Sequence, residues 1–170
     1  MKLTLVVATD KNFGIGLNGD MLFYISDDLK KFKALTMNNI VIMGRRTFEA
    51  LPNSKELPNR TNIVLTRNKL DLKEGIAVSS IDELKNKLEE INPNKEKEEF
   101  LIGGGNLVNT LWNYIDKAII TIADKEYKEV DTHIPNLLED KNFEIVSESE
   151  EFFDNKNQLK YKFYEFKRRV

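Results

Sequence analysis

The residue best suited to do chemistry is an aspartate on the apolar side of a predicted helix, within "NGDMLFYISDDLKKFKAL" (residues 18–35). Ser26 is predicted to cap a helix over 26–36, and acids in the first turn suit the helix dipole. At about 100° per residue, Asp28 lies within roughly 60° of Phe32 and Leu35. The other charged residues of this helix point elsewhere: Asp27, Lys30, Lys31 and Lys33.

Two interpretations of Asp28 follow from this placement. Both aspartates of the pair can simply charge the start of the helix, as acids in a first turn commonly do. Alternatively, Asp28 is a half-buried carboxylate at the mouth of a pocket. There its pKa can be tuned, and it can hold a proton or a cationic ring. The helix alone leaves both interpretations open.

Anion-binding groups gather at the ends of three predicted strands. In "VIMGRRTFEAL" (41–51), helix amides, two guanidinium groups and a hydroxyl favour phosphate at a strand-to-helix junction: Gly44, Arg45, Arg46 and Thr47. "FLIGGGNLVNTLW" (100–112) has a similar junction with Gly103, Gly104 and Gly105, although Val108 rules out a G-x-G-x-x-G fingerprint. Thr66 and Arg67 end a third strand. Parallel strands share their carboxyl edge, so three anchors there predict a dinucleotide with an additional phosphate.

Composition excludes several other kinds of chemistry. The 170 residues contain no cysteine and one histidine, His133, which argues against a catalytic triad and against a multi-histidine or cysteine-ligated metal site. The net charge of −2 gives no basic field for nucleic acid. The apolar run at the N-terminus is too short for a signal peptide, and no stretch reaches the length of a membrane span. A cytoplasmic protein that relies on carboxylates or a bound cofactor is expected.

The elements that must position these residues alternate along the chain. Short β-branched runs predict strands at 3–8, 39–44, 61–66, 75–79, 99–104 and 116–123, and helices are predicted at 26–36, 45–51, 81–91 and 104–112. Strands that alternate with helices indicate an α/β fold with a parallel sheet covered on both faces. Residues 143–152 and 158–169 predict an antiparallel hairpin at the sheet edge. One domain over 1–170 is expected.

The order of these motifs resembles dihydrofolate reductase over essentially the whole chain. The matching stretches are "VVATDKNFGIGLNGDM" (6–21), "DDLKKFK" (27–33), "VIMGRRTFE" (41–49), "LPNRTNIVLTR" (57–67), "IGGG" (102–105), "IIT" (119–121) and "DTHIP" (131–135). The resemblance implies a single α/β domain with a mostly parallel sheet of about eight strands. It also implies NADPH-dependent reduction of dihydrofolate, binding of antifolate inhibitors, and a monomer.

The resemblance assigns the catalytic and substrate-binding residues. Asp28 matches the carboxylate that faces the pterin, and Thr121 is expected to hydrogen-bond it. Arg60 is expected to hold the α-carboxylate of the glutamate tail in a bidentate pair. Met21 and Phe23 are placed beside the reacting ring. The walls of the substrate slot are predicted to be Val6, Val7, Leu29, Phe32, Leu51, Leu57 and Ile102.

The same resemblance assigns the cofactor site. The expected cofactor-binding residues are Ala8, Ile15, Gly16, Gly44, Arg45, Arg46, Thr47, Leu65, Thr66, Arg67, Ile102, Gly103, Gly104, Gly105, Asn106 and Leu107. Arg67 is expected nearest the adenosine 2′-phosphate, and a cis peptide is expected between Gly103 and Gly104. Residues 14–21 would form a mobile loop that closes over the nicotinamide and bonds to Asp131.

Three positions depart from the family pattern. Leu22 and Phe23 stand where proline and tryptophan are usual, and Val108 replaces an aromatic residue expected beside the nicotinamide. Phe23 has no indole donor to anchor a water near the pterin. Two alternatives therefore stay open: a reductase of another pterin or of a riboflavin-pathway pyrimidine, and a non-catalytic NADPH- or folate-binding module. Arg60 argues against the first, and retention of Asp28 with Thr121 argues against the second.

Overall fold

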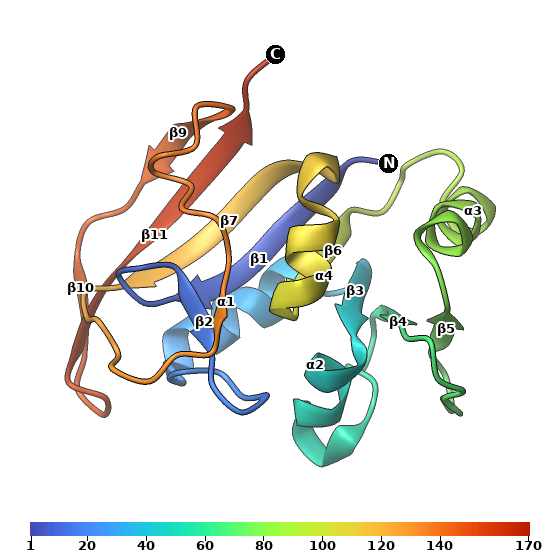
Figure 1. Ribbon diagram of the computed structural model, residues 1–170, viewed down its shortest axis with the longest axis horizontal. Coiled ribbons are helices and arrows are strands. Elements are labelled where there is room, and N and C mark those ends of the chain that lie inside the picture. Colours follow the sequence, from blue (N-terminus) through green and yellow to red (C-terminus); the bar gives the residue numbers. More distant parts are fainter.

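A central sheet organises the computed structural model, which describes residues 1–170 (Figure 1). Its strands are β1 (Leu3–Thr9), β3 (Ile40–Gly44), β4 (Thr61–Leu65), β5 (Ile76–Val78), β6 (Glu99–Gly103), β7 (Ile115–Ala123), β9 (Phe143–Glu148), β10 (Phe152–Asp154) and β11 (Leu159–Arg168). They lie in the order β10-β11-β7-β1-β6-β3-β4-β5, with β9 also paired to β11. β1, β3, β4, β5, β6 and β7 are mutually parallel, and β9, β10 and β11 add antiparallel pairs. This is the predicted α/β arrangement.

Helices cover both faces of this sheet: α1 (Ser26–Thr36), α2 (Arg45–Ala50), α3 (Ile81–Ile91) and α4 (Gly105–Thr110). Strand β3 shows how alternation divides the core. Ile40 and Ile42 join the cluster that contains residues of α3 and α4, whereas Val41 and Met43 join the cluster beside α1 and α2. In Figure 1, α4 accordingly lies in front of the sheet and α1 behind it. No helix has the length and apolar character that spanning a bilayer requires.

The start of α1 differs from the prediction. Ser26 is the first helical residue and does not cap the helix, because Ile25 occupies the cap position with extended backbone and no side-chain cap bond. Ile25 is 1% exposed and packs with Phe23, Ala123 and Leu159. Burial of this apolar residue therefore decides where the helix begins, in preference to a serine cap.

The C-terminal region is also more finely divided than predicted. The strand expected at 143–152 is two strands, β9 and β10, and both pair with β11. A second sheet, β2 (Gly14–Gly16) with β8 (Thr132–His133), was not predicted. The helix predicted over 104–112 ends at Thr110, and a 3-10 turn, η2 (Trp112–Tyr114), follows it; a second 3-10 turn, η1 (Pro52–Ser54), follows α2.

Candidate active site

One large cavity lies along the carboxyl edge of the parallel strands. It has a volume of about 1350 Å³ and is lined from β1, the loop before α1, α1 itself, the junctions β3–α2 and β6–α4, and the chain after β4 and β5. Single-ligand pockets typically have about 300–1,000 Å³. The cavity therefore has room for two ligands side by side.

Asp28 supplies the half-buried carboxylate of this cavity. The hydroxyl of Thr121 in β7 donates to its Oδ1 at 2.5 Å, which joins α1 to the centre of the sheet. Burial raises the pKa of Asp28 above its ordinary value, while the Thr121 hydrogen bond and the positive charge of Lys31 act to lower it. Asp27, one residue earlier, is exposed and does not line the cavity. The pocket interpretation of Asp28 is the one that the geometry supports.

Arg60 lies at the mouth of the same cavity. Its Nε donates to the carbonyl of Pro58 at 3.0 Å, and its Nη1 donates to Oγ1 of Thr36 at 3.2 Å. No carboxylate lies within ion-pairing distance of its guanidinium group in this structure. The side chain is therefore oriented by the protein, and its remaining N–H groups are left for an anionic ligand.

The two glycine junctions meet on the other side of the cavity. The peptide Gly103–Gly104 is cis, as expected, and Gly103 has φ +133°, which strongly favours glycine. A Cβ at Gly103 would lie 3.1 Å from Oγ1 of Thr47, and one at Gly104 would lie 3.3 Å from the same atom. A side chain at either position would therefore crowd Thr47 of α2, and at Gly103 the positive φ adds a second reason for glycine.

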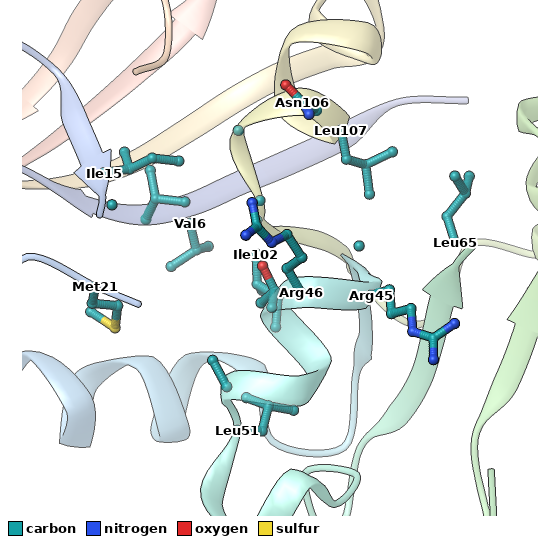
Figure 2. Close-up of a pocket in the computed structure, with 18 of the residues that line it drawn as sticks. Val6, Ile15, Met21, Arg45, Arg46, Leu51, Leu65, Ile102, Asn106 and Leu107 are labelled. Atoms are coloured by element: carbon teal, nitrogen blue, oxygen red, sulfur yellow. The ribbon is translucent and has the colours of Figure 1, made fainter. Parts of the chain in front are cut away.

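Three arginines line the cavity together with the glycines. Figure 2 shows the side chains of Arg45 and Arg46 leaving the start of α2 in different directions, Arg45 toward β4 and Arg46 toward Val6 and Ile15. Arg67 follows β4 and also lines the cavity. Guanidinium groups and closely approaching backbone are suited to phosphate groups.

The loop between β2 and α1 covers one end of the cavity. Gly19, Asp20 and Met21 line it, and the loop is bonded to Asp131, as expected. Oδ2 of Asp131 accepts from the amide of Asn18 at 2.8 Å, and the Asp131 amide donates to the carbonyl of Gly16 at 3.1 Å.

The structure brings together almost all the predicted site residues. The following line the cavity: Val6, Val7, Ala8, Ile15, Gly16, Met21, Asp28, Leu29, Phe32, Gly44, Arg45, Arg46, Thr47, Leu51, Leu57, Arg60, Leu65, Arg67, Ile102, Gly103, Gly104, Gly105, Asn106, Leu107 and Thr121. Two predicted site residues, Phe23 and Thr66, do not.

Phe23 and Thr66 lie outside the cavity wall, and so does Val108, the third position that departs from the family pattern. Phe23 is 5% exposed, because its ring packs with Ile25 and Ala123 and stacks on Tyr127 at 6.0 Å between centroids. The hydroxyl of Thr66 is turned toward its own chain and accepts from the amide of Asn68 at 3.2 Å. Val108 is fully buried in the main core.

Several lining residues were missed by the sequence analysis. They include Tyr24, Lys31, Ser79, Ser80, Lys85 and Tyr114. Ser79 and Ser80 had a usable signal, because they stand between a strand and a helix just as the two glycine junctions do. Lys85 and Tyr114 had none, since the hydrogen bond between them, 2.8 Å long, joins residues that are far apart in the sequence.

Comparisons with known proteins agree with this geometry. Residues 2–168 match the family model described as dihydrofolate reductase. Dihydrofolate reductase of Bacillus subtilis (strain 168) is 32% identical over 167 residues, 98% of this chain and 95% of that protein. Dihydrofolate reductase type 9 of Escherichia coli is 32% identical over 161 residues, 92% of this chain and 89% of that protein.

A solved structure has the same fold. Dihydrofolate reductase from Enterococcus faecalis, complexed with NADP(H) and RAB-propyl, has a TM-score of 0.84 and 27% identity, covering 99% of this chain and 97% of that one. The expected fold, NADPH cofactor and reductase activity are thus confirmed. The chain belongs to the dihydrofolate reductase family and is an NADPH-dependent oxidoreductase.

Proposed function

We propose that this protein reduces 7,8-dihydrofolate to 5,6,7,8-tetrahydrofolate with Asp28 as its essential carboxylate. The observation that carries the proposal is the position of Asp28, half-buried in the cavity wall and hydrogen-bonded to Thr121. Asp20 and Asp82 also line the cavity, but both are exposed. Asp28 is thus the carboxylate that an aromatic ring entering the cavity would meet away from water.

Asp28 has the chemistry to orient and protonate a pterin. Its two oxygens can accept two parallel N–H donors, one from N3 and one from the 2-amino group of the ring. A negative charge at this position favours a proton on N5, which polarises the C6–N5 double bond toward nitrogen. The Thr121 hydroxyl keeps the carboxylate in one orientation.

NADPH, when bound, supplies the hydride that C6 accepts. The groups that would hold it are the cis glycine peptide, the start of α2 and the arginines around them. The Thr47 hydroxyl lies so near Gly103 and Gly104 that a Cβ on either would crowd it. This cradle and the volume of the cavity fit a dinucleotide beside the substrate.

Arg60 favours a folate over the alternative substrates. Its guanidinium group is held by Pro58 and Thr36 and can pair with the α-carboxylate of a glutamate tail. Another pterin or a riboflavin-pathway pyrimidine lacks that carboxylate and would leave Arg60 without a function. Asp28 with Thr121, a pair suited to proton chemistry, likewise favours an enzyme over a binding module.

The remaining parts of the proposal concern ligands and setting. We propose that antifolate inhibitors occupy the substrate side of the cavity, where a protonated ring would pair with Asp28. We also propose that the protein works in the cytoplasm as a monomer. Sedimentation at micromolar concentration tests the monomer, and competition by a 2,4-diaminopyrimidine against dihydrofolate tests the inhibitor site.

A matched pair of variants tests the role of Asp28. Asp28→Asn should slow NADPH-dependent reduction of dihydrofolate by about two to four orders of magnitude, because a lost acid–base group has that effect. The defect should shrink as pH falls, since dihydrofolate then protonates in solution. Asp27→Asn removes the same charge from an exposed neighbour and should keep the wild-type rate. A rate near wild type for Asp28→Asn at neutral pH would refute the assignment.

A further inference from the structure

A lysine one helical turn after Asp28 has a fixed position that the reaction described above does not use. The Nζ atom of Lys31 lies 3.7 Å from the centroid of the Phe163 ring, a cation–π contact between α1 and β11. Lys31 lines the cavity together with Asp28. Residues three apart on a helix are neighbours on its surface, so the two charges lie on the same side of α1.

The sheet explains why this lysine is held beside the carboxylate. Thr121 of β7 hydrogen-bonds to Asp28. Its register partner on β11 is Phe163, whose ring contacts the ammonium group of Lys31. Side chains of paired residues lie on one face of a sheet. Two adjacent strands therefore contact α1 through two of its charged side chains. β7 contacts the carboxylate of Asp28, and β11 contacts the ammonium group of Lys31.

The charged groups around this pair define its electrostatics. Glu165 follows Phe163 by two residues, so it lies on the same sheet face, and its charge acts on Lys31. Burial lowers the pKa of Lys31, while Asp28 and Glu165 each act to raise it. Tyr161 of β11 also faces this region: burial raises its pKa, and Asp27, Asp154 and Asp28 raise it further. Lys31 is the one cation of this set.

We propose that Lys31 is a positioning residue that acts through Asp28: its ammonium group, held over Phe163, is the countercharge of the catalytic carboxylate and sets the pH range of hydride transfer. Lys31 and Asp28 do not form a direct ion pair, since no carboxylate oxygen lies within 4.0 Å of the Lys31 Nζ atom in this structure. The interaction is therefore through space. This inference rests on the role proposed above for Asp28.

The inference has a definite sign. A positive charge near a carboxylate favours its ionised form. Removing the charge should therefore let Asp28 take up a proton at a higher pH than in the wild type. An opposite charge within about 4–6 Å shifts a pKa by about 1–3 units, and a more distant one by less. We therefore expect the pH profile of hydride transfer to move upward when the charge of Lys31 is removed.

Single-turnover hydride transfer, with saturating NADPH and dihydrofolate across pH, tests the inference. Lys31→Met should move the pH profile upward. Lys31→Arg keeps the charge and the cation–π contact, so it should keep the wild-type profile. Lys30→Met is the control, because Lys30 is an exposed neighbour that lies outside the cavity wall. It should leave the profile unchanged.

The double variant Asp28→Asn/Lys31→Met separates the two proposals. With the carboxylate gone, loss of Lys31 should cause no further shift of the profile. If Asp28→Asn itself reacts at the wild-type rate, the role of Asp28 fails. If Asp28→Asn is slow but Lys31→Met keeps the wild-type profile, only the inference fails. A higher Michaelis constant for dihydrofolate alone, with no shift, would instead make Lys31 a contact for the glutamate tail and overturn the inference.

Discussion

Arg60→Lys is the substitution that best distinguishes folate from a substrate without a tail. Two hydrogen bonds, to Pro58 and to Thr36, orient the guanidinium group and leave its outer N–H groups for a carboxylate. Lysine keeps the charge but replaces a planar fork with a single ammonium group. Hydrogen bonds to charged groups contribute about 1.5–3 kcal/mol, so losing one of two parallel bonds should raise the Michaelis constant about 10- to 100-fold.

The assay compares dihydrofolate with dihydropterin, which has no glutamate tail. The Michaelis constant for dihydropterin should barely change in Arg60→Lys, because Arg60 has no group on that substrate to bind. Thr36→Val removes one anchor of the guanidinium group and should cause a smaller rise for dihydrofolate only. Arg169→Lys, far from the cavity, serves as the control. Equal effects on both substrates would mean that Arg60 is structural, and the reasoning about the tail would be wrong.

Three further predictions concern stability, cofactor choice and packing. Burial raises the pKa of Asp28 in the folded protein, so the ionised carboxylate destabilises the folded state at pH values above the unfolded pKa of about 3.9. Asp28→Asn should therefore unfold at a higher urea concentration than the wild type at neutral pH. The difference should disappear in acid, where Asp28 is protonated in both states. Arg67→Ala should reduce the preference for NADPH over NADH about tenfold by weakening NADPH, whereas Lys69→Ala, outside the cavity, should not. Phe23→Trp should destabilise folding by about 1–3 kcal/mol without tightening dihydrofolate binding, because the Phe23 site is filled by Tyr127 and its neighbours; unchanged stability with tighter binding would contradict this.

Elements with strong local signals were predictable from the sequence. The helix predicted at 81–91 has those bounds in the structure, because Ser80 caps it through the amide of Glu83 and Leu84 and Leu88 are buried one turn apart. Buried parallel strands such as β3 were equally clear, since they are continuous apolar runs. Here local propensity and tertiary burial favour the same structure.

Elements without such signals were missed or misplaced. β2 and β8 have three and two residues, and "GIG" has no alternation that predicts a strand. They pair only because the loop returns to Asp131, which no local pattern encodes. The predicted cap at Ser26 failed for the opposite reason: its local signal was good, but burial of Ile25 outweighed it.

The candidate site shows a similar division between backbone and side chain. Resemblance assigned site roles to Phe23 and Thr66 from their positions in the chain, but it could not fix the direction of their side chains. Phe23 turns into a cluster that also contains Ile25 and residues of β7 and β11, and the hydroxyl of Thr66 accepts a hydrogen bond from the nearby amide of Asn68. A backbone position is thus inherited from the order of motifs, whereas the direction of a side chain depends on the volumes that surround it in this particular core.

The environment of Asp28 combines both kinds of information. Its place on the apolar face of α1 follows from helical periodicity, and this is why the sequence singled it out. Its partner Thr121 is 93 residues away and comes from another strand. Lys31 was assigned to a different side of the helix, but it is three residues from Asp28 and lines the cavity, with its ammonium group over Phe163, the register partner of Thr121. The position of the Lys31 ammonium group relative to Asp28 therefore depends on strand register as well as on helix spacing. A lysine side chain is long enough to reach over a neighbouring ring from the edge of an apolar stripe, so periodicity places its Cβ but not its charge.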